Sequence, residues 1–484
     1  SIGSNPNRIL DMGTIEGGET NTYSLNLWIT DEVDGNYGGQ VFSGKLRVEV
    51  SQERKTVAEV LLADSANNIN TSDPEQTFIT GENPNNYIWY SGKLWRAVSI
   101  DPSDNSVKLV TDRAVTTVSY DDSSNSYEDS NIKEWLNDTS VDGFLGNLRE
   151  PEKFMKMDSK WNATAMTDTS KPPKTTIVTS PVGMLNSYEY ESSLGGNSYN
   201  NGYLNIRLDT WILNPYDNNR SIAVTSSGEF NTDVGYLNSY GIRPTINLQS
   251  SIKIVDGSGT EDDPYRLMGD NDNNLSETYL KDRYSGEYIR FGTGENNLYR
   301  IVSHETEGLT KIASAQPLKD NGVLKEISFG DYIYSPNSGI GEFLNDEYLK
   351  QYLTTEDVNM VEKDTIWYLG NMTKASDNYK LSKYKDENGN NLSDNTSVAT
   401  VGLLRFSELM STQSENARYN KTLSTLTIIE HLSLFIGISQ YGGGAYNTDN
   451  TMIFAIRPAL NLKSNVIITS GDGTKENPFE LSVQ

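Results

Sequence analysis

Cysteine is absent from this 484-residue chain, and histidine is nearly so. The lack of cysteine excludes disulfides, thiolate nucleophiles and cysteine-ligated metals. Because His304 and His431 are the only histidines, a three-histidine metal site cannot form within one chain. A histidine-based catalytic triad has the same two candidates. No run of 18 apolar residues occurs, so we expect no segment to insert into a membrane.

Basic residues are scarce beside acidic ones: 40 Lys and Arg face 66 Asp and Glu, a formal net charge of −26. Nucleic acids and anionic membranes are recognised through positive patches, so neither is expected as a partner. The acidity suits a solvated surface outside the cell, or cation binding. The chain begins at Ser1 without Met, which we interpret as a mature or trimmed fragment of a longer protein.

One sequence pattern occurs twice. GIRPTINL begins at Gly241 and AIRPALNL at Ala455, and each is followed by a Gly-x-Gly-Thr turn and an aromatic residue, Tyr265 or Phe479. The offset is constant, since 457 − 243 = 214 and 479 − 265 = 214. Earlier matches have offsets between 201 and 219 (288 − 87 and 401 − 182), as insertions in surface loops would produce. The pattern predicts a tandem duplication.

The chain is therefore expected to divide into two repeats after a shorter N-terminal segment. Alternating polar and apolar residues predict strands near Leu25 and Leu46, too few to close a core. They are expected to pair with strands upstream of Ser1, with another chain or with the next domain. The predicted parts are a partial β-sandwich segment (1–54), a linker or transition (55–80), repeat 1 (81–268), a linker (269–278) and repeat 2 (279–484).

Two resemblances to known families follow from these motifs. The stretch from Gly17 to Ile29, followed by a strand at Phe42–Val48, resembles the camelysin-like biofilm and surface proteins of Gram-positive bacteria. That resemblance implies secretion and an immunoglobulin-like β-sandwich. The repeats resemble an uncharacterised domain family of Firmicutes surface proteins, which is similar to the formylglycine-generating-enzyme branch of the C-type-lectin-like fold.

The second resemblance implies an α+β domain in which an irregular antiparallel sheet packs on one or two helices and long loops carry binding. The whole chain is thus assigned to the α+β and β classes. Enzymes of that branch need cysteines, copper ligands or a histidine cluster, which these residues cannot supply. The repeated motif residues are interpreted as structural, with ligand binding by the arginines as the alternative. They are Arg243, Pro244, Arg457, Pro458, Trp135 and Phe343. Trp135 shares one helical face with Ile132 and Leu136, and Phe343 is its match in the second repeat, so both are expected on a helix.

Loop tyrosines are the candidate ligand-binding residues. They lie among Asn, Ser and Gly, a mixture that suits protein recognition or sugar stacking; alternatively, the tyrosines anchor the loops. They are Tyr188, Tyr190, Tyr199, Tyr203, Tyr441 and Tyr446. The two copies differ most in the loops that contain them, at 186–235 and 405–450.

Calcium is the one cofactor considered. Asp270, Asp272 and Asn274 place oxygen ligands at alternate positions, as calcium loops do. Leu275 and Lys281 stand where an EF-hand requires Gly and Glu, so only an irregular site is possible.

These observations predict a secreted Gram-positive cell-surface protein without catalysis. Its expected role is adhesion, or recognition of a host or bacterial surface glycan or protein. Two alternatives stay open. One is a structural subunit of a surface fibre or layer that self-associates through the N-terminal strands. The other is a glycan hydrolase using paired carboxylates such as Asp121 and Asp122.

Overall fold

The computed structural model describes residues 54–484 except 141–142, 271–274, 305, 307, 332, 338, 370, 373–395, 406–407, 409–422, 430–433, 439–444, 449–450 and 452. The predicted N-terminal strands lie outside these residues. Residues Glu53–Gln484 form one compact unit, to which the following description is confined. Strand accounts for 33% and helix for 17% of the structure, in agreement with the predicted α+β or β class.

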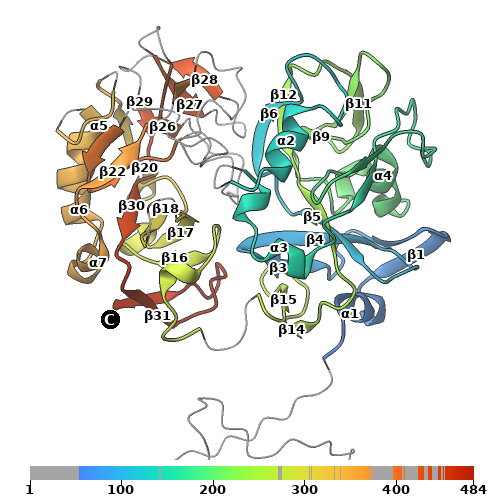
Figure 1. Ribbon diagram of the computed structural model, residues 1–484, viewed down its shortest axis with the longest axis horizontal. Helices are drawn as coiled ribbons and strands as arrows, with labels where there is room; N and C mark the ends of the chain where they lie inside the picture. Colours follow the sequence, from blue (N-terminus) through green and yellow to red (C-terminus); the bar gives the residue numbers. More distant parts are fainter. Residues whose placement is uncertain are drawn as a thin grey trace, which may run out of the picture. The chain divides into compact units, whose positions relative to one another are not determined.

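The first half of this unit, residues 54–270, is built on an eight-stranded sheet (Figure 1). The order is β1-β2-β4-β3-β15-β14, and β5 joins β4 to β13. The strands are β1 (Asn68–Asp73), β2 (Gln76–Thr80), β3 (Tyr87–Tyr90), β4 (Lys93–Ile100), β5 (Val107–Thr111), β13 (Thr245–Leu248), β14 (Ile254–Asp256) and β15 (Tyr265–Leu267).

Residues 55–80, predicted as a linker or transition, belong to this fold. Thr56 caps helix α1 (Val57–Ala63), and Leu61 is buried in the core. Phe78 of β2 pairs with Ser99 of β4, which ties the β1–β2 hairpin to the sheet. The segment looks polar because β1 is an edge strand whose residues are mostly exposed or half-buried.

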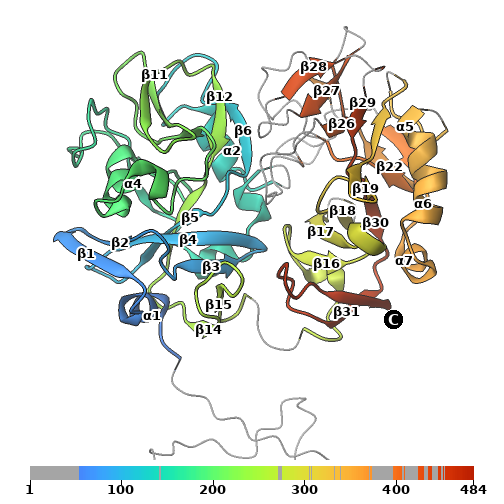
Figure 2. The same ribbon diagram turned by 180° about the vertical axis from the view of Figure 1, so that it is seen from behind.

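A second sheet, the two-stranded ribbon of β7 and β8, and five short helices complete the described part of the first half. The sheet order is β11-β10-β9-β12-β6. Figure 2 shows α4 beside the β1–β2 hairpin. These elements are β6 (Thr116–Ser119), α2 (Asn131–Asn137), η2 (Leu145–Asn147), α3 (Pro151–Phe154), β7 (Lys160–Asn162), β8 (Ile177–Thr179), α4 (Ser187–Leu194), η3 (Tyr199–Asn201), β9 (Thr210–Trp211), β10 (Ser221–Val224), β11 (Phe230–Val234) and β12 (Ser239–Ile242).

The second half, residues 275–484, contains a five-stranded sheet, β16-β17-β18-β30-β25, and a six-stranded sheet, β21-β29-β26-β27-β28, with β23 on β26. Its sheet strands are β16 (Tyr288–Arg290), β17 (Leu298–Ser303), β18 (Thr310–Ser314), β21 (Glu326–Ser328), β23 (Asn371–Met372), β25 (Val401–Gly402), β26 (Leu423–Ile429), β27 (Leu434–Ile438), β28 (Ala445–Thr448), β29 (Ile453–Ala455) and β30 (Ala459–Leu462).

Short ribbons and helices surround these sheets. The helices are η4 (Leu280–Asp282), η5 (Gly294–Asn296), α5 (Gly339–Glu342), the π-helical η6 (Phe343–Glu347), α6 (Tyr348–Gln351) and α7 (Thr355–Met360). The two-stranded ribbons are β19 (Lys319–Asp320) with β20 (Val323–Leu324), β22 (Thr365–Tyr368) with β24 (Thr396–Ala399), and β31 (Val466–Ser470) with β32 (Glu480–Val483).

The duplicated Ile-Arg-Pro motif makes the same contacts in both halves. The buried Arg243 donates from Nε to the Thr111 carbonyl over 2.9 Å, and Arg457 donates to the Ser314 carbonyl over 2.8 Å. Both arginines thus bond the carbonyl of the last residue of a strand, β5 or β18, a contact expected of a structural residue. The prolines also make equivalent contacts. The Pro244 carbonyl accepts a hydrogen bond of 3.0 Å from the Thr111 N–H, and the Pro458 carbonyl accepts one of 3.0 Å from the Ser314 N–H.

The two halves also meet in a small apolar cluster formed by Trp89, Tyr288 and Ala315. The rings of Trp89 and Tyr288 lie 6.3 Å apart. The predicted boundary at 269–278 therefore does not separate two independent bodies, because residues on either side of it share a buried junction.

Candidate functional site

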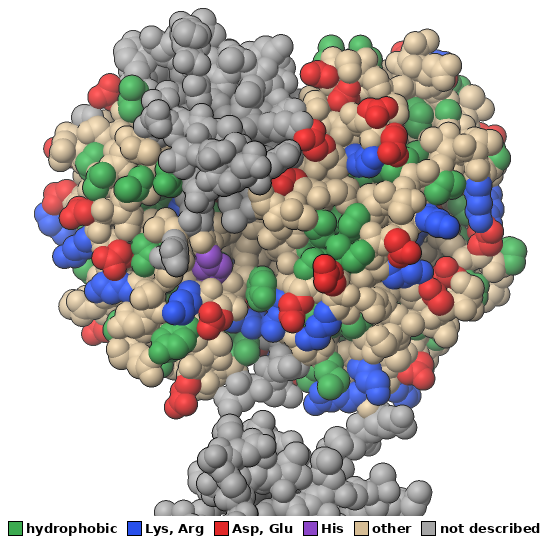
Figure 3. Space-filling view, viewed as in Figure 1, with side chains coloured by type: hydrophobic (Ala, Val, Ile, Leu, Met, Phe, Trp, Pro, Cys, Tyr) green, Lys and Arg blue, Asp and Glu red, His purple; other side chains and the backbone are tan. Residues whose placement is uncertain are grey.

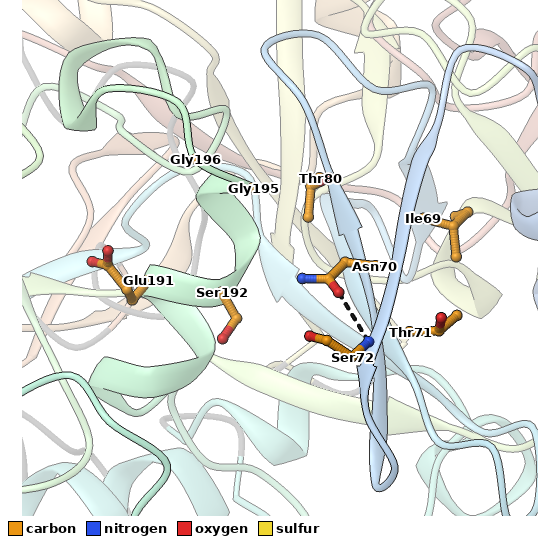
Figure 4. A pocket seen from close by; sticks show the side chains of 9 residues that line it. All are labelled: Ile69, Asn70, Thr71, Ser72, Thr80, Glu191, Ser192, Gly195 and Gly196. Atoms are coloured by element: carbon orange, nitrogen blue, oxygen red, sulfur yellow. Dashed lines mark hydrogen bonds between the residues drawn. The ribbon is translucent and has the colours of Figure 1, made fainter.

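A groove of about 590 Å³ lies between the β1–β2 hairpin and the C-terminal end of α4 (Figure 4). Mostly polar, uncharged residues line it, with Glu191 as the one charged side chain. The lining residues are Ile69, Asn70, Thr71, Ser72, Thr80, Glu191, Ser192, Gly195 and Gly196. We call it the hairpin–helix groove.

The hairpin side of the groove presents a preoriented amide. Asn70 Oδ1 accepts a hydrogen bond of 3.0 Å from the Ser72 backbone N–H. Because that N–H can only donate, the bond assigns the oxygen and leaves the amide nitrogen facing α4, as Figure 4 shows. The Ser72 hydroxyl points the same way, whereas Ile69 and Thr71 lie on the other side of the hairpin.

The helix side is set by the ends of α4. Asn186 caps its start through a hydrogen bond of 2.9 Å from the Glu189 N–H. Gly195 ends it in a left-handed conformation, with φ of 59°. A Cβ on Gly195 would lie 2.6 Å from Cβ of Thr80, so glycine is needed for this close approach of helix and hairpin. Ser192 points into the space between them, and Glu191 points away from the hairpin (Figure 4).

A buried carboxylate fastens the hairpin to its surroundings. Asp73 accepts from the Tyr188 hydroxyl over 2.8 Å and from Lys171 Nζ over 2.6 Å. Burial alone would raise the pKa of Asp73, but the hydrogen bonds from Lys171, the Glu75 N–H and Tyr188 outweigh it and hold the pKa below its ordinary value. Asp73 is therefore an ionised anchor, and it keeps Asn70 and Ser72 in place opposite α4.

The groove offers many hydrogen-bonding groups that keep their charge state near neutral pH. Its hydroxyl and amide side chains donate and accept at neutral pH without changing charge. Figure 3 shows acidic and basic side chains interspersed on the face in view, without a continuous basic patch among the described residues there. This chemistry fits a neutral, hydroxyl-rich ligand better than a polyanion.

The loop tyrosines proposed as ligand contacts differ in burial and in position. Tyr190 and Tyr203 are buried, which corrects their assignment as surface contacts. The Tyr203 hydroxyl donates toward the Ile79 carbonyl over 3.1 Å, so it anchors the loop to the sheet. Tyr188 is half-buried against Phe78 and Asp73, and it is not among the residues that line the hairpin–helix groove.

The other three tyrosines lie elsewhere. Tyr199 is half-buried, with its ring 6.1 Å from that of Phe230. Tyr441 lies outside the described residues. Tyr446 lies on β28, and only its backbone is described.

Only Asp270 of the three candidate calcium ligands lies within the described residues. Asp270 is buried, and its Oδ2 accepts from the Ser91 N–H over 3.1 Å. Burial, followed by the nearby charge of Glu287, raises the pKa of Asp270 to about 7. Asp272 and Asn274 lie outside the described residues, within which no group of three His, Asp or Glu side chains could hold a metal ion.

The two aromatic residues of the helix motif pack in cores. Trp135 is fully buried, with its ring 5.8 Å from that of Phe144. Phe343 is partly buried against the second core, and its ring lies 6.2 Å from Tyr352. Both therefore stand where the structural interpretation expects them.

Sequence reasoning missed the groove because it assigned Asn70 and Ser72 to a linker. A signal was present: Asn-x-Ser followed by Asp73-Pro74 is typical of a turn in which a side chain binds the backbone. The position of α4 opposite this turn depends on contacts between residues more than 100 positions apart, such as Tyr188 with Asp73.

Comparisons with known proteins supply no relative for this site. No protein-family model matches the chain, and neither a curated protein nor a solved structure is similar to it. Within the described residues, no helix has the length and apolarity needed to cross a membrane.

Proposed function

We propose that the protein is a secreted cell-surface recognition protein that binds a neutral glycan in the hairpin–helix groove without chemical turnover. One observation carries the proposal: the Asn70 amide, fixed by Ser72, faces a groove lined by hydroxyls. Sugar hydroxyls both donate and accept, so they match such a lining. We further propose that the two halves arose by duplication and share a C-type-lectin-like ancestry, supported by the recurring arginine contacts.

Asn70→Asp tests this site with little change in shape. A carboxylate still accepts from the Ser72 N–H, so the turn is kept, but the donor that faces the groove is lost. Losing one hydrogen bond to a ligand costs about 1–3 kcal/mol, so binding should weaken about 5- to 100-fold. Arrays of bacterial and host surface glycans, probed with the full chain, identify the ligand, and titration gives the affinity ratio.

Asn231→Asp is the matched control. Asn231 Oδ1 accepts from the Asp233 N–H, two residues further along the chain as in Asn70 and Ser72, and it lies on β11, outside the groove lining. It should leave binding unchanged. If no glycan binds the wild type, glycan recognition is wrong; if Asn70→Asp binds as the wild type does, the groove is not the site.

A further inference from the structure

Two tight turns meet at the junction between the halves. Ser91 and Gly92 join β3 to β4, and Ser285 and Gly286 precede β16. A Cβ on Gly92 would lie 2.6 Å from the Glu287 nitrogen, and one on Gly286 would lie 2.4 Å from the Gly92 carbonyl oxygen. Glycine at both positions therefore allows the backbones of the two turns to approach each other closely.

Two cations are buried between these turns. Lys93 has no exposed surface, and Arg300 is 3% exposed. Lys93 Nζ donates only to carbonyls, those of Ser91, Asn147 and Ser285, over 3.2–3.5 Å.

The Arg300 guanidinium is held in the same way. It donates to the carbonyls of Gly286 and Gly92, over 2.9 and 3.1 Å. Within the described residues, no carboxylate lies within the 4.0 Å of an ion pair with Lys93 or Arg300.

The nearby acids face other groups, although Oδ1 of Asp270 is buried without a hydrogen-bond partner. Glu287 forms a two-point ion pair with Arg283, and Asp270 binds the Ser91 N–H with Arg149 at 3.9 Å. Arg149 also lies 3.4 Å from Glu150, so the junction holds four cations, Lys93, Arg149, Arg283 and Arg300, against three acids, a surplus of 4 − 3 = +1. This surplus is buried in a chain whose net charge is −26.

Unpaired donors accompany the surplus. Arg300 Nη1 and the Ser285 hydroxyl are buried without a hydrogen-bond partner. Such orphaned groups indicate a bound water or ion, because an unsatisfied buried donor costs about 1–3 kcal/mol.

The pKa of Lys93 depends on this buried environment. Burial and then the charge of Arg300 lower its pKa to about 7, against the opposing effects of Glu287 and Asp270. An anion beside Lys93 would favour its charged form.

We propose that a small inorganic anion of the chloride type binds at this junction, held by Arg300 Nη1 and the Ser285 hydroxyl. The Lys93 ammonium, whose three N–H groups bond carbonyls, favours the anion through its charge alone. The site is separate from the hairpin–helix groove. It couples the two halves, since Lys93 belongs to β4 and Arg300 to β17. The competing account has Lys93 neutral and water on the orphaned donors.

Thermal unfolding of the full chain in sodium chloride and in sodium gluconate, at equal ionic strength, separates the two accounts. Gluconate is too bulky for the junction, so chloride should raise the unfolding midpoint by about 2–4 °C. The difference should be larger at about pH 6 than at about pH 9, because Lys93 loses its charge between them. Crystals soaked in bromide should show an anomalous peak beside Arg300.

Lys93→Met is the matched variant, and it should lose the difference between the two salts. Equal midpoints of the wild type in both salts would overturn the proposal. So would an unchanged chloride effect in Lys93→Met, or a bromide map without a peak at the junction. The wild-type comparison and the bromide map need no variant, so the proposal is testable even if Lys93→Met does not fold.

Discussion

Gly183 lies against the face of a buried tryptophan and should not tolerate a methyl group. A Cβ on Gly183 would stand 2.3 Å from Cδ2 of Trp161, well inside contact distance. Hydrogen bonds fix both Gly183 and Trp161, so neither can move away from the other easily. Gly183 and Thr245 exchange backbone hydrogen bonds of 2.9 and 2.8 Å, and the Trp161 indole donates to the Ser180 carbonyl over 2.8 Å. Gly183→Ala therefore forces overpacking, which costs about 1–3 kcal/mol of unfolding free energy.

The assay is urea unfolding followed by tryptophan fluorescence, and Gly235→Ala is the control. Gly235 is exposed, and an added Cβ there meets only Asn238 Oδ1, at 3.9 Å. The control should change the unfolding free energy by no more than about 0.5 kcal/mol. Gly402→Ala, whose Cβ would lie 2.6 Å from Cδ2 of Trp367, should match Gly183→Ala.

Replacing Trp161 with a smaller ring supplies the decisive comparison. Trp161→Phe opens space for the methyl group that Gly183→Ala adds. The double variant should therefore be more stable than the sum of the two single losses predicts, by about 1 kcal/mol or more. Additive losses, or a Gly183→Ala cost equal to that of Gly235→Ala, would refute the close contact as the cause.

Two further perturbations test the buried charges. The pKa of Lys93 is lowered to about 7 in the folded state. Between about pH 7 and about pH 10.5 the folded state therefore binds fewer protons than the unfolded state. The free energy of unfolding should rise with pH in this range, by up to about 1.4 kcal/mol per pH unit. Lys93→Met should remove this rise in gluconate buffer; an unchanged slope in urea titrations would contradict it. Lys108→Met should lower the free energy of unfolding by about 3–5 kcal/mol, because it leaves the buried Glu189 without its ion-pair partner. Lys133→Met breaks the more exposed pair with Glu128 and should lower it by less than about 1 kcal/mol. Equal losses by urea unfolding would contradict this ranking.

Local patterns predicted those elements whose signal lies in a few neighbouring residues. Ile132, Trp135 and Leu136 share one helical face, and all three are buried on α2, which begins after its Ser130 cap. The hairpin of β1 and β2 escaped prediction because an edge strand can be polar and still pair. Tyr190 and Tyr203 were misassigned because the same loop composition serves recognition and anchoring, and only burial separates the two.

The hairpin–helix groove was out of reach for a different reason. Its two sides are separated in sequence by more than 100 residues, and they meet through single contacts, such as that of Tyr188 with Asp73. Neither contact partner carries a periodic signal of its own. A repeat comparison does not help either, because the equivalent loop of the second half lies largely outside the described residues.

The junction between the halves rests on a difference between the two copies. Asp112 and Ala315 occupy equivalent positions, since each N–H donates over 2.9 Å to the carbonyl of Leu94 or Leu298. In the first half, Arg96 lies 3.6 Å from the Asp112 carboxylate.

In the second half, Ala315 supplies no charge to the corresponding Arg300, which lies over the Tyr288 ring as Arg96 lies over Tyr87. Arg300 donates instead to the Gly92 carbonyl of the first half, and the small Ala315 side chain joins Trp89 in the junction cluster. Alanine at position 315, where the first half has Asp112, thus explains why Arg300 has no carboxylate partner at the junction. It also leaves room for the contact of Trp89 with Tyr288. Sequence comparison of the copies shows the difference at position 315, but its meaning emerges only once Gly92 is seen beside Arg300.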